Sequence, residues 1–510
     1  MLTRHLIATA LLWPLALGLS ATEQPLQLTE QTSYSQGIFN RSAAEIIVYS
    51  ADNRQFYLVN GANPSVDILQ IKDSSLTKTR SLPLGAHEQP TSVAVHNDLV
   101  AVTVHEIKAT GRPGKVIILN PSAKRLAEIP VGDLPDMVIF SKDGRYILTA
   151  NEGEPREGTD PEGSVSVITL NKENLANSPV RTVSFDTLNT DELRRKGVRI
   201  APGKTPAKDF EPEYITISGQ TAYVSLQENN AIAVIDIASA SLTGILPLGY
   251  KDHTLPGNGL DTSDKDGVAS ISNHPIRGFY MPDTLASFSQ SGKTYLATAN
   301  EGDAREEVIR LGKAKLDKTL KTKLKEANTG NRLKISTTDG DIDNDGDIDI
   351  AYSYGARSFS LWDETGTLVF DSGDQFAQTT LRQLGFNGFN TSNDKNRGDN
   401  RSDDKGSEPE AITIGTIDGR TYAFIGLERS GGIMIYDVTE PATSKFISYY
   451  NNRNFDPALD PSAGIDTLAA AGHLGPECVL FIPANQSPYG KPTLAVAYEV
   501  SGSVGLYTIE

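Results

Sequence analysis

The sequence has a single cysteine, Cys478, which excludes an intramolecular disulfide. A folded chain of this length must therefore be held together by packing or by bound metal. Cys478 lies in the apolar segment PECVLFIP, so we expect it to be buried and unreactive. Basic residues are fewer than acidic ones, and the net charge of -17 excludes nucleic acid and anionic membranes as partners. An acidic chain attracts cations, so a divalent cation is the first partner to expect.

Long hydrophobic runs are absent after the N-terminus. The first 21 residues contain Arg4, an apolar stretch over 6–19 and small residues before the segment TEQP. This is the pattern of a secretory signal peptide, 1–21, and it is too short for a stable membrane span. We expect residues 22–510 to form a single exported domain, periplasmic or secreted. We expect this domain to be a monomer without a membrane span or a C-terminal anchor.

Familiar catalytic motifs are also missing. The sequence has no GxSxG, HExxH, P-loop or CxxC pattern, and only six histidines follow the N-terminal segment. His105 and His473 precede acids of the repeat described below, which makes them the best candidates for a general base.

The sequence does contain a repeated pair of acids. A Pro-acid dipeptide opens a short apolar run, and a second acid follows some 15 to 22 residues later. The dipeptides are Pro135-Asp136, Pro212-Glu213, Pro282-Asp283, Pro409-Glu410 and Pro476-Glu477. The second acids are Glu152, Glu228, Glu301, Glu428 and Glu499. A weaker copy joins Pro90-Thr91 to Glu106, and Glu45 to Ile71 has the same rhythm with Asn60 as its closing residue. Seven units of this size indicate a propeller, an array or a solenoid.

The segments around these acids have the pattern of strands. Runs such as YITISGQTAYVSL are rich in β-branched and aromatic residues and are interrupted by turn pairs such as Asp143-Gly144. A third strand follows most of the second acids, and a connecting fourth completes the content of one propeller blade. We therefore predict an all-β, seven-bladed β-propeller with helical and acidic-loop insertions. Its acids would ring one mouth of the channel, where they raise one another's pKa or recruit cations.

The ring supplies candidate site residues, because converging acids with arginine counter-charges can hold metal or phosphate. The catalytic candidates are Glu152, Glu213, Glu301, Arg305, Arg357, Glu410, Glu428 and Arg429. Further metal candidates are Glu211, Glu228, Asp303, Glu408 and Glu477. The alternative is that acids at turns only accept backbone N–H bonds.

The spacing of the opening prolines predicts two insertions, since a bare blade needs about 40 to 50 residues. Residues 188–209 are expected to carry a short helix with Thr190 as its N-cap. Residues 304–407 are expected to carry a helix with Leu316, Leu320 and Leu324 on one face. Within them, the polar stretch 387–407 predicts an exposed or metal-ordered loop.

The strongest local motif is DGDIDNDGDIDI, residues 339–350. Alternating carboxylates around Gly346 supply the hard oxygen ligands that Ca²⁺ prefers. The predicted ligands are Asp341, Asp343, Asp345, Asp347 and Asp349. The fit to an EF-hand loop is incomplete, because the twelfth position is Tyr352 instead of Glu. We predict a Ca²⁺ loop of modest affinity without flanking helices; the alternative is a solvated acidic turn.

Several strings resemble a known family. TANEGEPREG, PGNGLDTSDKDG, FYMPDTLASF, TANEGDARE and YGARSFSLWD look like the choice-of-anchor I domain family, over nearly all of the chain after the N-terminal segment. That family includes mesenchyme-specific cell-surface glycoproteins associated with biomineral in marine invertebrates. The resemblance implies a seven-bladed, YVTN/WD40-like propeller in an exported protein. Some bacterial relatives carry the label alkaline phosphatase.

Three functions are compatible with these observations. The leading hypothesis is a non-catalytic, calcium-binding exported propeller that binds a ligand, a surface polymer or mineral. The second is a calcium-dependent phosphohydrolase, a metal-dependent phosphoric ester hydrolase in which metals at the mouth activate a water and arginines hold the phosphate. The third is a structural scaffold for protein contacts.

Overall fold

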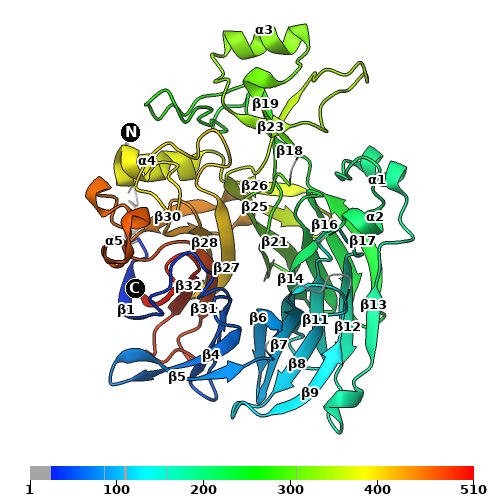
Figure 1. Ribbon diagram of the computed structural model, residues 1–510, viewed down its shortest axis with the longest axis vertical. Coiled ribbons are helices and arrows are strands. Elements are labelled where there is room, and N and C mark those ends of the chain that lie inside the picture. The colour runs from blue at the N-terminus through cyan, green and yellow to red at the C-terminus, as the bar shows by residue number, and fades with distance from the viewer. Residues whose placement is uncertain (1–24, 86, 108–111, 157, 306) are drawn as a thin grey trace, which may run out of the picture.

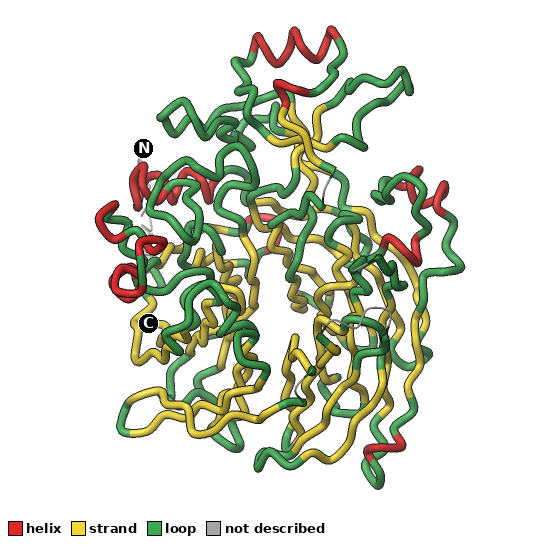
Figure 2. The backbone as a smooth tube through the Cα atoms, viewed as in Figure 1, coloured by secondary structure: helices red, strands yellow, loops and turns green. Residues whose placement is uncertain are grey.

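The structure is a computed structural model that describes residues 25–85, 87–107, 112–156, 158–305 and 307–510. The expected signal peptide, 1–21, lies outside the described residues. The described strands form seven four-stranded antiparallel sheets and two smaller sheets. The seven sheets stand side by side around a common centre (Figure 1), and Figure 2 shows that strands make up most of this ring.

The first four sheets follow one another along the chain, each ordered from its inner to its outer strand. The first contains β2 (Ile47–Ser50), β3 (Gln55–Asn60), β4 (Ser65–Lys72) and β5 (Ser75–Pro83). The second contains β6 (Glu88–His96), β7 (Leu99–Glu106), β8 (Lys115–Leu119) and β9 (Arg125–Pro130). The third contains β10 (Pro135–Phe140), β11 (Tyr146–Asn151), β12 (Ser164–Thr169) and β13 (Val180–Val183). The fourth contains β14 (Pro212–Ser218), β15 (Thr221–Leu226), β16 (Ala231–Asp236) and β17 (Ser241–Pro247).

The remaining three sheets complete the ring. The fifth contains β20 (Leu285–Gln290), β21 (Lys293–Asn300), β25 (Ser358–Asp363) and β26 (Leu368–Asp371). The sixth contains β27 (Pro409–Ile417), β28 (Arg420–Leu427), β29 (Ile433–Asp437) and β30 (Lys445–Tyr450). The seventh contains β31 (Pro476–Ile482), β32 (Thr493–Tyr498), β33 (Ser503–Ile509) and, as its outer strand, β1 (Leu28–Ser35). Each inner strand contacts the next one, and β31 contacts β2. The prediction of an all-β propeller is confirmed.

Neighbouring sheets are held together by separate apolar clusters, one at each of the interfaces around the ring. Tyr57 and Val102 belong to the cluster between the first and second sheets, and Ile47 packs with Ala495 where the seventh sheet meets the first. Burial of each such aliphatic side chain contributes about 1.5 to 3 kcal/mol. Cys478 is buried in this last cluster, as predicted, and burial raises the pKa of its thiol to about 11.

The seventh sheet joins the two ends of the described chain. Strand β1 pairs with β33 from Leu28 opposite Ile509 to Ser35 opposite Ser503. The ring is therefore closed by backbone hydrogen bonds between an N-terminal and a C-terminal strand, which leaves fewer unpaired strand edges.

A lobe with its own apolar core stands at one side of the ring (Figure 1). Its three-stranded sheet contains β18 (Tyr250–Asp252), β19 (Ile276–Phe279) and β24 (Ala351–Ser353), and its hairpin contains β22 (Val308–Arg310) and β23 (Lys334–Ser336). Helix α3 (Lys318–Glu326) is capped by Asp317 and buries Leu320 and Leu324, which confirms the amphipathic helix, but Leu316 lies before its start and packs into the same apolar core. The lobe combines residues from before β20 and from between β21 and β25.

The other insertion near the fourth sheet contains α1 (Thr190–Lys196) and α2 (Pro206–Asp209). The expected N-cap was wrong by one residue, because Asn189, not Thr190, accepts the N–H of Glu192. Asn is at least as good an N-cap as Thr, since its side-chain oxygen reaches the first turn in the same way.

Residues 304–407 divide into two inserted segments, because β25 and β26 between them complete the fifth sheet. The second segment contains α4 (Gln375–Gly388) and the polar loop 387–407, and α5 (Ile465–Ala471) follows the sixth sheet. The loop was expected to be exposed or ordered by metal; much of it is buried, so the first alternative was wrong, and the second stays a prediction. Thr391 and Ser402 are fully buried, and Asn390 donates to the Ser402 hydroxyl at 2.9 Å. Among the described residues, no helix is both long and apolar enough to cross a bilayer.

Candidate functional site

The repeated acids owe their position to a shared backbone feature. In β10, β14, β27 and β31 the strand pairing shifts directly after the opening proline, as in a β-bulge. Proline lacks an N–H and is tolerated where the ladder is interrupted. A bulge re-aims the side chain that follows, and that residue is the first acid of each pair.

The second acid of each pair lies beside the first because of strand register. Pro135 stands opposite Asn151, and the next residue, Glu152, donates its N–H to the carbonyl of Leu134 at 2.8 Å. The same bond joins Glu428 to Glu408 at 2.8 Å and Glu499 to Gly475 at 2.8 Å. The start of the inner strand and the end of its partner therefore place both acids at one mouth of the ring.

The residue before the opening proline is often left-handed. This residue has φ of 44° at Leu134, 48° at Met281, 50° at Glu408 and 70° at Gly475. Left-handed backbone is unfavourable for Leu, Met and Glu, and such strain persists only where the surroundings enforce it. The repeat is therefore a structural device that turns the chain sharply into the mouth.

The acids of the mouth influence one another around the whole ring. Burial, followed by neighbouring carboxylates, raises the pKa of Glu152, Glu213, Glu410 and Glu477 well above the usual value. Burial and Glu499 raise the pKa of Glu45 to about 8, and burial raises that of Asp136 to about 6. Burial and Glu301 raise the pKa of Asp283 to about 7, although a hydrogen bond with Glu410 opposes the rise. Several of these carboxyls keep some solvent contact although they crowd together at the mouth, and crowding of like charges disfavours their ionised form.

Glu408 is the exception within this acidic mouth, because cations surround it. Its side chain has no exposed surface and pairs with Arg401, with Arg429 at 2.9 Å and with Lys405 at 3.3 Å. Burial raises the pKa of Glu408, but the three cations outweigh burial and hold the pKa below its usual value. Lys405 also pairs with Glu301 at 2.5 Å. Glu408 is therefore an anion at neutral pH, fixed among side chains that are positively charged.

A separate group of acids at the mouth surrounds Arg305, which follows β21. Arg305 pairs with Asp209 at 3.1 Å, Glu211 at 3.1 Å and Glu228 at 3.5 Å. Burial raises the pKa of Glu211 to about 7 and of Glu228 to about 8, although Arg305 lowers both. The single positive charge of Arg305 therefore faces three carboxyl groups and can balance only part of the negative charge that they carry when ionised.

Two of the candidate residues, Arg357 and Asp303, make their hydrogen bonds with backbone groups. Arg357 is fully enclosed and donates to the carbonyls of Asp261 at 3.0 Å and Ser402 at 2.9 Å, so it holds the inserted loops together. The exposed carboxylate of Asp303 accepts the N–H of Ala304 at 2.6 Å and is directed at its own turn. Both are better explained as structural than as site residues.

Among the described residues, one trio of carboxylates at the mouth is close enough for a metal. Glu301, Glu408 and Glu428 each offer an oxygen, and these oxygens lie within 4.8 Å of one another. The same oxygens are already neutralised, because Arg429 pairs with Glu428 at 3.0 Å while Lys405 and Arg429 hold Glu408. A divalent ion here would have to displace ammonium and guanidinium groups, so the trio does not fit a metal.

The aspartate loop is different. Asp341, Asp343 and Asp349 bring three oxygens within 4.8 Å, and Asp317, Asp347 and Asp349 form a second such group. Most of this loop is exposed. Ca–O distances of about 2.3 to 2.6 Å allow one ion to span oxygens separated by this much. The donor set therefore fits Ca²⁺.

Backbone bonds shape the loop without using all of its oxygen atoms. Asp341 accepts the N–H of Gly346 at 3.0 Å, and Asp349 accepts that of Ile342 at 2.8 Å. Asp345 lies outside both groups of oxygens and accepts the N–H of Asp347 at 3.0 Å. The arrangement therefore differs from the expected set of five, and Asp317 from the start of α3 joins it.

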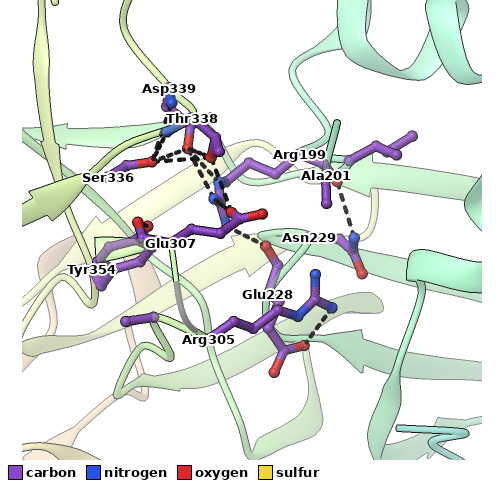
Figure 3. A network of polar contacts seen from close by, with 12 residues as sticks. Arg199, Ala201, Glu228, Asn229, Arg305, Glu307, Ser336, Thr338, Asp339 and Tyr354 are labelled. Atoms are coloured by element: carbon purple, nitrogen blue, oxygen red, sulfur yellow. Dashed lines mark hydrogen bonds and ion pairs between the residues drawn. The ribbon is translucent and has the colours of Figure 1, made fainter. Parts of the chain in front are cut away.

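A cavity of 710 Å³ lies between the aspartate loop, the α1–α2 insertion and the fourth sheet. Asp339 and Asp341 line it on one side, and Glu228 and Arg305 line it on the other, so it reaches the acidic mouth. Figure 3 shows Arg199 bridging the two sides: its guanidinium bonds Asp339 at 2.9 Å and the carbonyl of Glu228 at 2.6 Å.

Aromatic rings form another wall of this cavity. Phe279 and Tyr352 stack with their centroids 4.6 Å apart, and the Arg277 guanidinium lies 4.1 Å from the centre of Tyr250. Arg277 also donates to the Tyr352 hydroxyl at 3.0 Å. Ring faces beside fixed, planar polar groups are suited to polyhydroxylated ligands, which have apolar faces and hydroxyl edges.

Sequence reasoning missed the inserted residues that complete the mouth. Lys405 and Arg401 come from the polar loop, and Asn393 of the same loop donates to Glu428 at 2.9 Å. Gln227 donates to Glu301 at 2.8 Å. No repeat marks these residues; the nearest signal is the unusual mixture of Asn, Lys and Arg in 387–407.

Comparison with known proteins gives consistent relatives. A family model described as "Choice-of-anchor I domain" matches residues 45–441. Gigasin-3a of Magallana gigas is 31% identical over 189 residues, which cover 35% of this chain and 64% of that protein. A mesenchyme-specific cell surface glycoprotein of Strongylocentrotus purpuratus is 28% identical over 301 residues, 50% of this chain and 38% of that protein. The matched region therefore spans less than two thirds of either relative.

Among solved structures, streptogramin B lyase aligns with 95% of this chain and 98% of its own, at 12% identity and a TM-score of 0.48. YCF48 bound to D1 peptide aligns with 96% of this chain and 97% of its own, at 7% identity and a TM-score of 0.43.

Proposed function

We propose that this chain, which belongs to the choice-of-anchor I domain family, is an exported, calcium-binding propeller that binds a surface polymer without catalysing a reaction. The relative from Strongylocentrotus purpuratus is described as a cell surface glycoprotein, which supports a role at a cell surface. The N-terminal sequence pattern supports export.

A single observation carries the proposal: the loop whose aspartates bring three oxygens within 4.8 Å also lines the 710 Å³ cavity that reaches the acidic mouth. A Ca²⁺ ion held by Asp341, Asp343 and Asp349 would neutralise mutual repulsion in the loop and fix the wall formed by Asp339 and Asp341. Calcium is better suited than Mg²⁺, because it tolerates irregular geometry and sheds water more easily. Calcium would thereby prepare the cavity for its ligand.

The cavity suggests the class of polymer. Tyr250 is 42% exposed and lies in the cavity with Arg277 against its ring, while Phe279 and Tyr352 stack beside it. Such a wall suits sugar rings, whose apolar faces pack on aromatic rings and whose hydroxyls bond carboxylates and guanidinium groups. We therefore propose a polysaccharide, the type of polymer that cell surfaces present.

The test has two arms. Calorimetric titration of the purified mature chain with CaCl₂ should give one site of modest affinity, which Asp343→Asn abolishes and Glu326→Gln, on the exposed face of α3, leaves intact. Sedimentation with insoluble chitin, cellulose and peptidoglycan should then show Ca²⁺-dependent binding that Tyr250→Ala weakens about tenfold or more. Phe386→Ala removes an equally exposed ring, 41%, from outside the cavity and is the matched control.

Each arm can fail separately. No heat with CaCl₂, together with an unchanged melting temperature in chelator, would contradict the calcium site. Ca²⁺ binding without retention on any of the three polymers would contradict the polysaccharide. Release of phosphate from a phosphomonoester by metal-replete chain, lost in Glu428→Gln, would replace the proposal with the phosphohydrolase alternative.

A further inference from the structure

A second cavity, of 400 Å³, lies on the seventh sheet beside α5 and independently of the proposed ligand site. Its wall includes Glu30 of β1, Ser503 of β33 and His473 from the loop before β31. Apolar Leu468 and Ala469 of α5 close one side. Three segments that are distant in sequence therefore bring an acid, an imidazole and a hydroxyl to one cavity.

The three side chains form a hydrogen-bonded line. His473 Nδ1 lies 2.7 Å from Ser503 Oγ, and His473 Nε2 lies 3.5 Å from Glu30 Oε1. The imidazole stacks on Tyr498 with centroids 4.6 Å apart, which fixes the plane of the ring. Asn452 donates to Glu30 Oε2 at 3.2 Å and anchors the acid.

The direction of the bonds follows from the charge on Glu30. The hydrogen bond with His473 is the main cause that lowers the pKa of Glu30, so this carboxyl is an acceptor at neutral pH. In the neutral imidazole, Nε2 then carries the proton and Nδ1 has the free lone pair. Ser503 consequently donates its proton to Nδ1. A hydroxyl bonded to a base that is oriented by an acid is the arrangement of an activated nucleophile.

The equivalent serines of other sheets do not have this arrangement. Ser503 stands opposite Tyr498, the last residue of β32, just as Ser164 stands opposite Asn151 and Ser358 opposite Asn300. In those two sheets the Asn amide donates to the serine at 3.2 Å, so the hydroxyl is an acceptor in a structural network. In the seventh sheet, Tyr498 takes the place of that asparagine, and the loop before β31 supplies the imidazole of His473 as the acceptor. In the third and fifth sheets, the serine at this position is held by an amide, so the structure does not require an imidazole there.

We propose that Ser503, His473 and Glu30 form a nucleophilic site that hydrolyses small acyl esters. Ser503 Oγ attacks the ester carbonyl and forms an O–C bond while its proton moves to His473 Nδ1. The C–O bond to the alcohol then breaks, and Nδ1 returns the proton to the departing oxygen. Water repeats the sequence: its proton goes to Nδ1, its oxygen bonds the acyl carbon, and Ser503 leaves with the proton. The released products are one alcohol and one carboxylic acid.

Neighbouring groups suit this chemistry. Ser501 Oγ lies 2.7 Å from Ser503 Oγ, accepts the Leu474 N–H at 3.0 Å and lies 3.4 Å from the Leu474 carbonyl oxygen, so a second hydroxyl stands beside the attacking oxygen. Glycines 37 and 472 and the short side chain of Ala469 leave room in the cavity for a short acyl chain.

The experiment uses the mature chain with a fluorophosphonate probe, followed by peptide mass spectrometry, and with p-nitrophenyl acetate in a stopped-flow burst assay. We expect covalent labelling at Ser503 and a burst of nitrophenol equal to the enzyme concentration. Ser503→Ala should abolish both, and His473→Asn should slow acylation by about 10²- to 10⁴-fold. Ser164→Ala, at the same position of the third sheet, should change neither.

Glu30 is a positioning residue, so its variant needs another measurement. Nitrogen-15 NMR of the imidazole should show the Nε2–H tautomer of His473 in the wild type and loss of that preference in Glu30→Gln, with slower labelling. If the folded wild-type chain is labelled elsewhere or not at all, the site is structural and the proposal is overturned. If Ser503→Ala fails to fold, Ser503→Cys tested with iodoacetamide, and compared with Ser164→Cys, decides whether position 503 is activated.

Discussion

The mouth of the ring and the aspartate loop are both crowded with carboxylates, yet they are balanced in opposite ways. In the mouth, the protein supplies its own cations: Lys405 and Arg429 pair with Glu408, and Arg305 pairs with Glu211. In the loop, among the described contacts, Arg199 pairs with Asp339 at 2.9 Å and Lys315 bonds only the carbonyl of Gly346, at 3.1 Å, while no ion pair reaches the predicted ligands from Asp341 to Asp349. Acid content alone therefore does not identify a metal site; what matters is whether the protein already supplies the counter-charge.

The largest effect should come from removing the central anion of the mouth. Glu408→Gln leaves Arg401, Arg429 and Lys405 buried together without their common partner. Breaking one side of a buried charge cluster costs about 3 to 5 kcal/mol, which urea unfolding should measure. Glu326→Gln, an exposed glutamate, is the control. If Glu408→Gln is as stable as this control, the mouth is not held together by its cations.

Stability should also depend on pH in a direction set by the mouth. The raised pKa values of about 8 for Glu45 and Glu228, and of about 7 for Asp283, mean that the folded state binds protons that the unfolded state releases. Between about pH 4.5 and 8 these groups therefore make the fold less stable as pH rises, by at most about 1.4 kcal/mol per pH unit each and less where water enters.

Thermal unfolding across this range measures the effect. Glu408 opposes it only at low pH, because its lowered pKa contributes stability that is lost as pH falls below the usual range. We expect the melting temperature to decline from pH 5.5 to 8.5 and to decline less in Glu228→Gln. A melting temperature that rises over this interval would show that the carboxyls of the mouth are ionised with little cost.

Calcium should separate the two regions. At a free Ca²⁺ concentration a hundred times the dissociation constant, binding should stabilise the fold by about 2.7 kcal/mol. Asp343→Asn should remove this gain, whereas Glu301→Gln, in the neutralised trio of the mouth, should retain it. Retention of the gain in Asp343→Asn and its loss in Glu301→Gln would move the metal to the mouth.

Asp345→Asn tests the geometry within the loop. This carboxylate lies outside both groups of oxygens, so its substitution should weaken Ca²⁺ binding less than Asp343→Asn does. Equal losses would favour an EF-hand-like register in which the first, third and fifth positions all bind the ion.

The smallest effect should come from Asp317, which caps α3 and also contributes to the second group of loop oxygens. Asp317→Ser keeps the cap and Asp317→Ala removes it, so only the alanine variant should lower the melting temperature, by a few degrees. Ca²⁺ titration of both variants shows whether Asp317 is a ligand: a ligand would weaken binding equally in both.

The sequence pattern predicted the propeller because the marks of each repeat, an opening proline, an acid and a hairpin, lie close together in the sequence. Register then explains why acids so far apart in sequence, such as Asp136 and Glu152, lie at one mouth. The cations of the mouth could not be predicted, since Lys405 and Arg401 come from a loop without a repeat and reach the ring only through tertiary packing. Arg357 could not be placed from the sequence either, because its guanidinium bonds the backbone carbonyls of Asp261 and Ser402, and tertiary packing alone brings those carbonyls to it.

Strand β1, which completes the seventh sheet, also affects the order in which the chain folds. Leu28 of β1 pairs with Ile509 of β33. In a chain that emerges in order from a ribosome or a translocation pore, β1 therefore stays unpaired until β33 has appeared. The first six sheets can stack before then, but the ring stays open. The inner strands β2 and β27 lack the neighbour that they share in the complete ring, β31. Closure is thus a late step across the longest sequence separation in the fold, where folding is slow and an unpaired strand is most easily captured by a chaperone or by another copy.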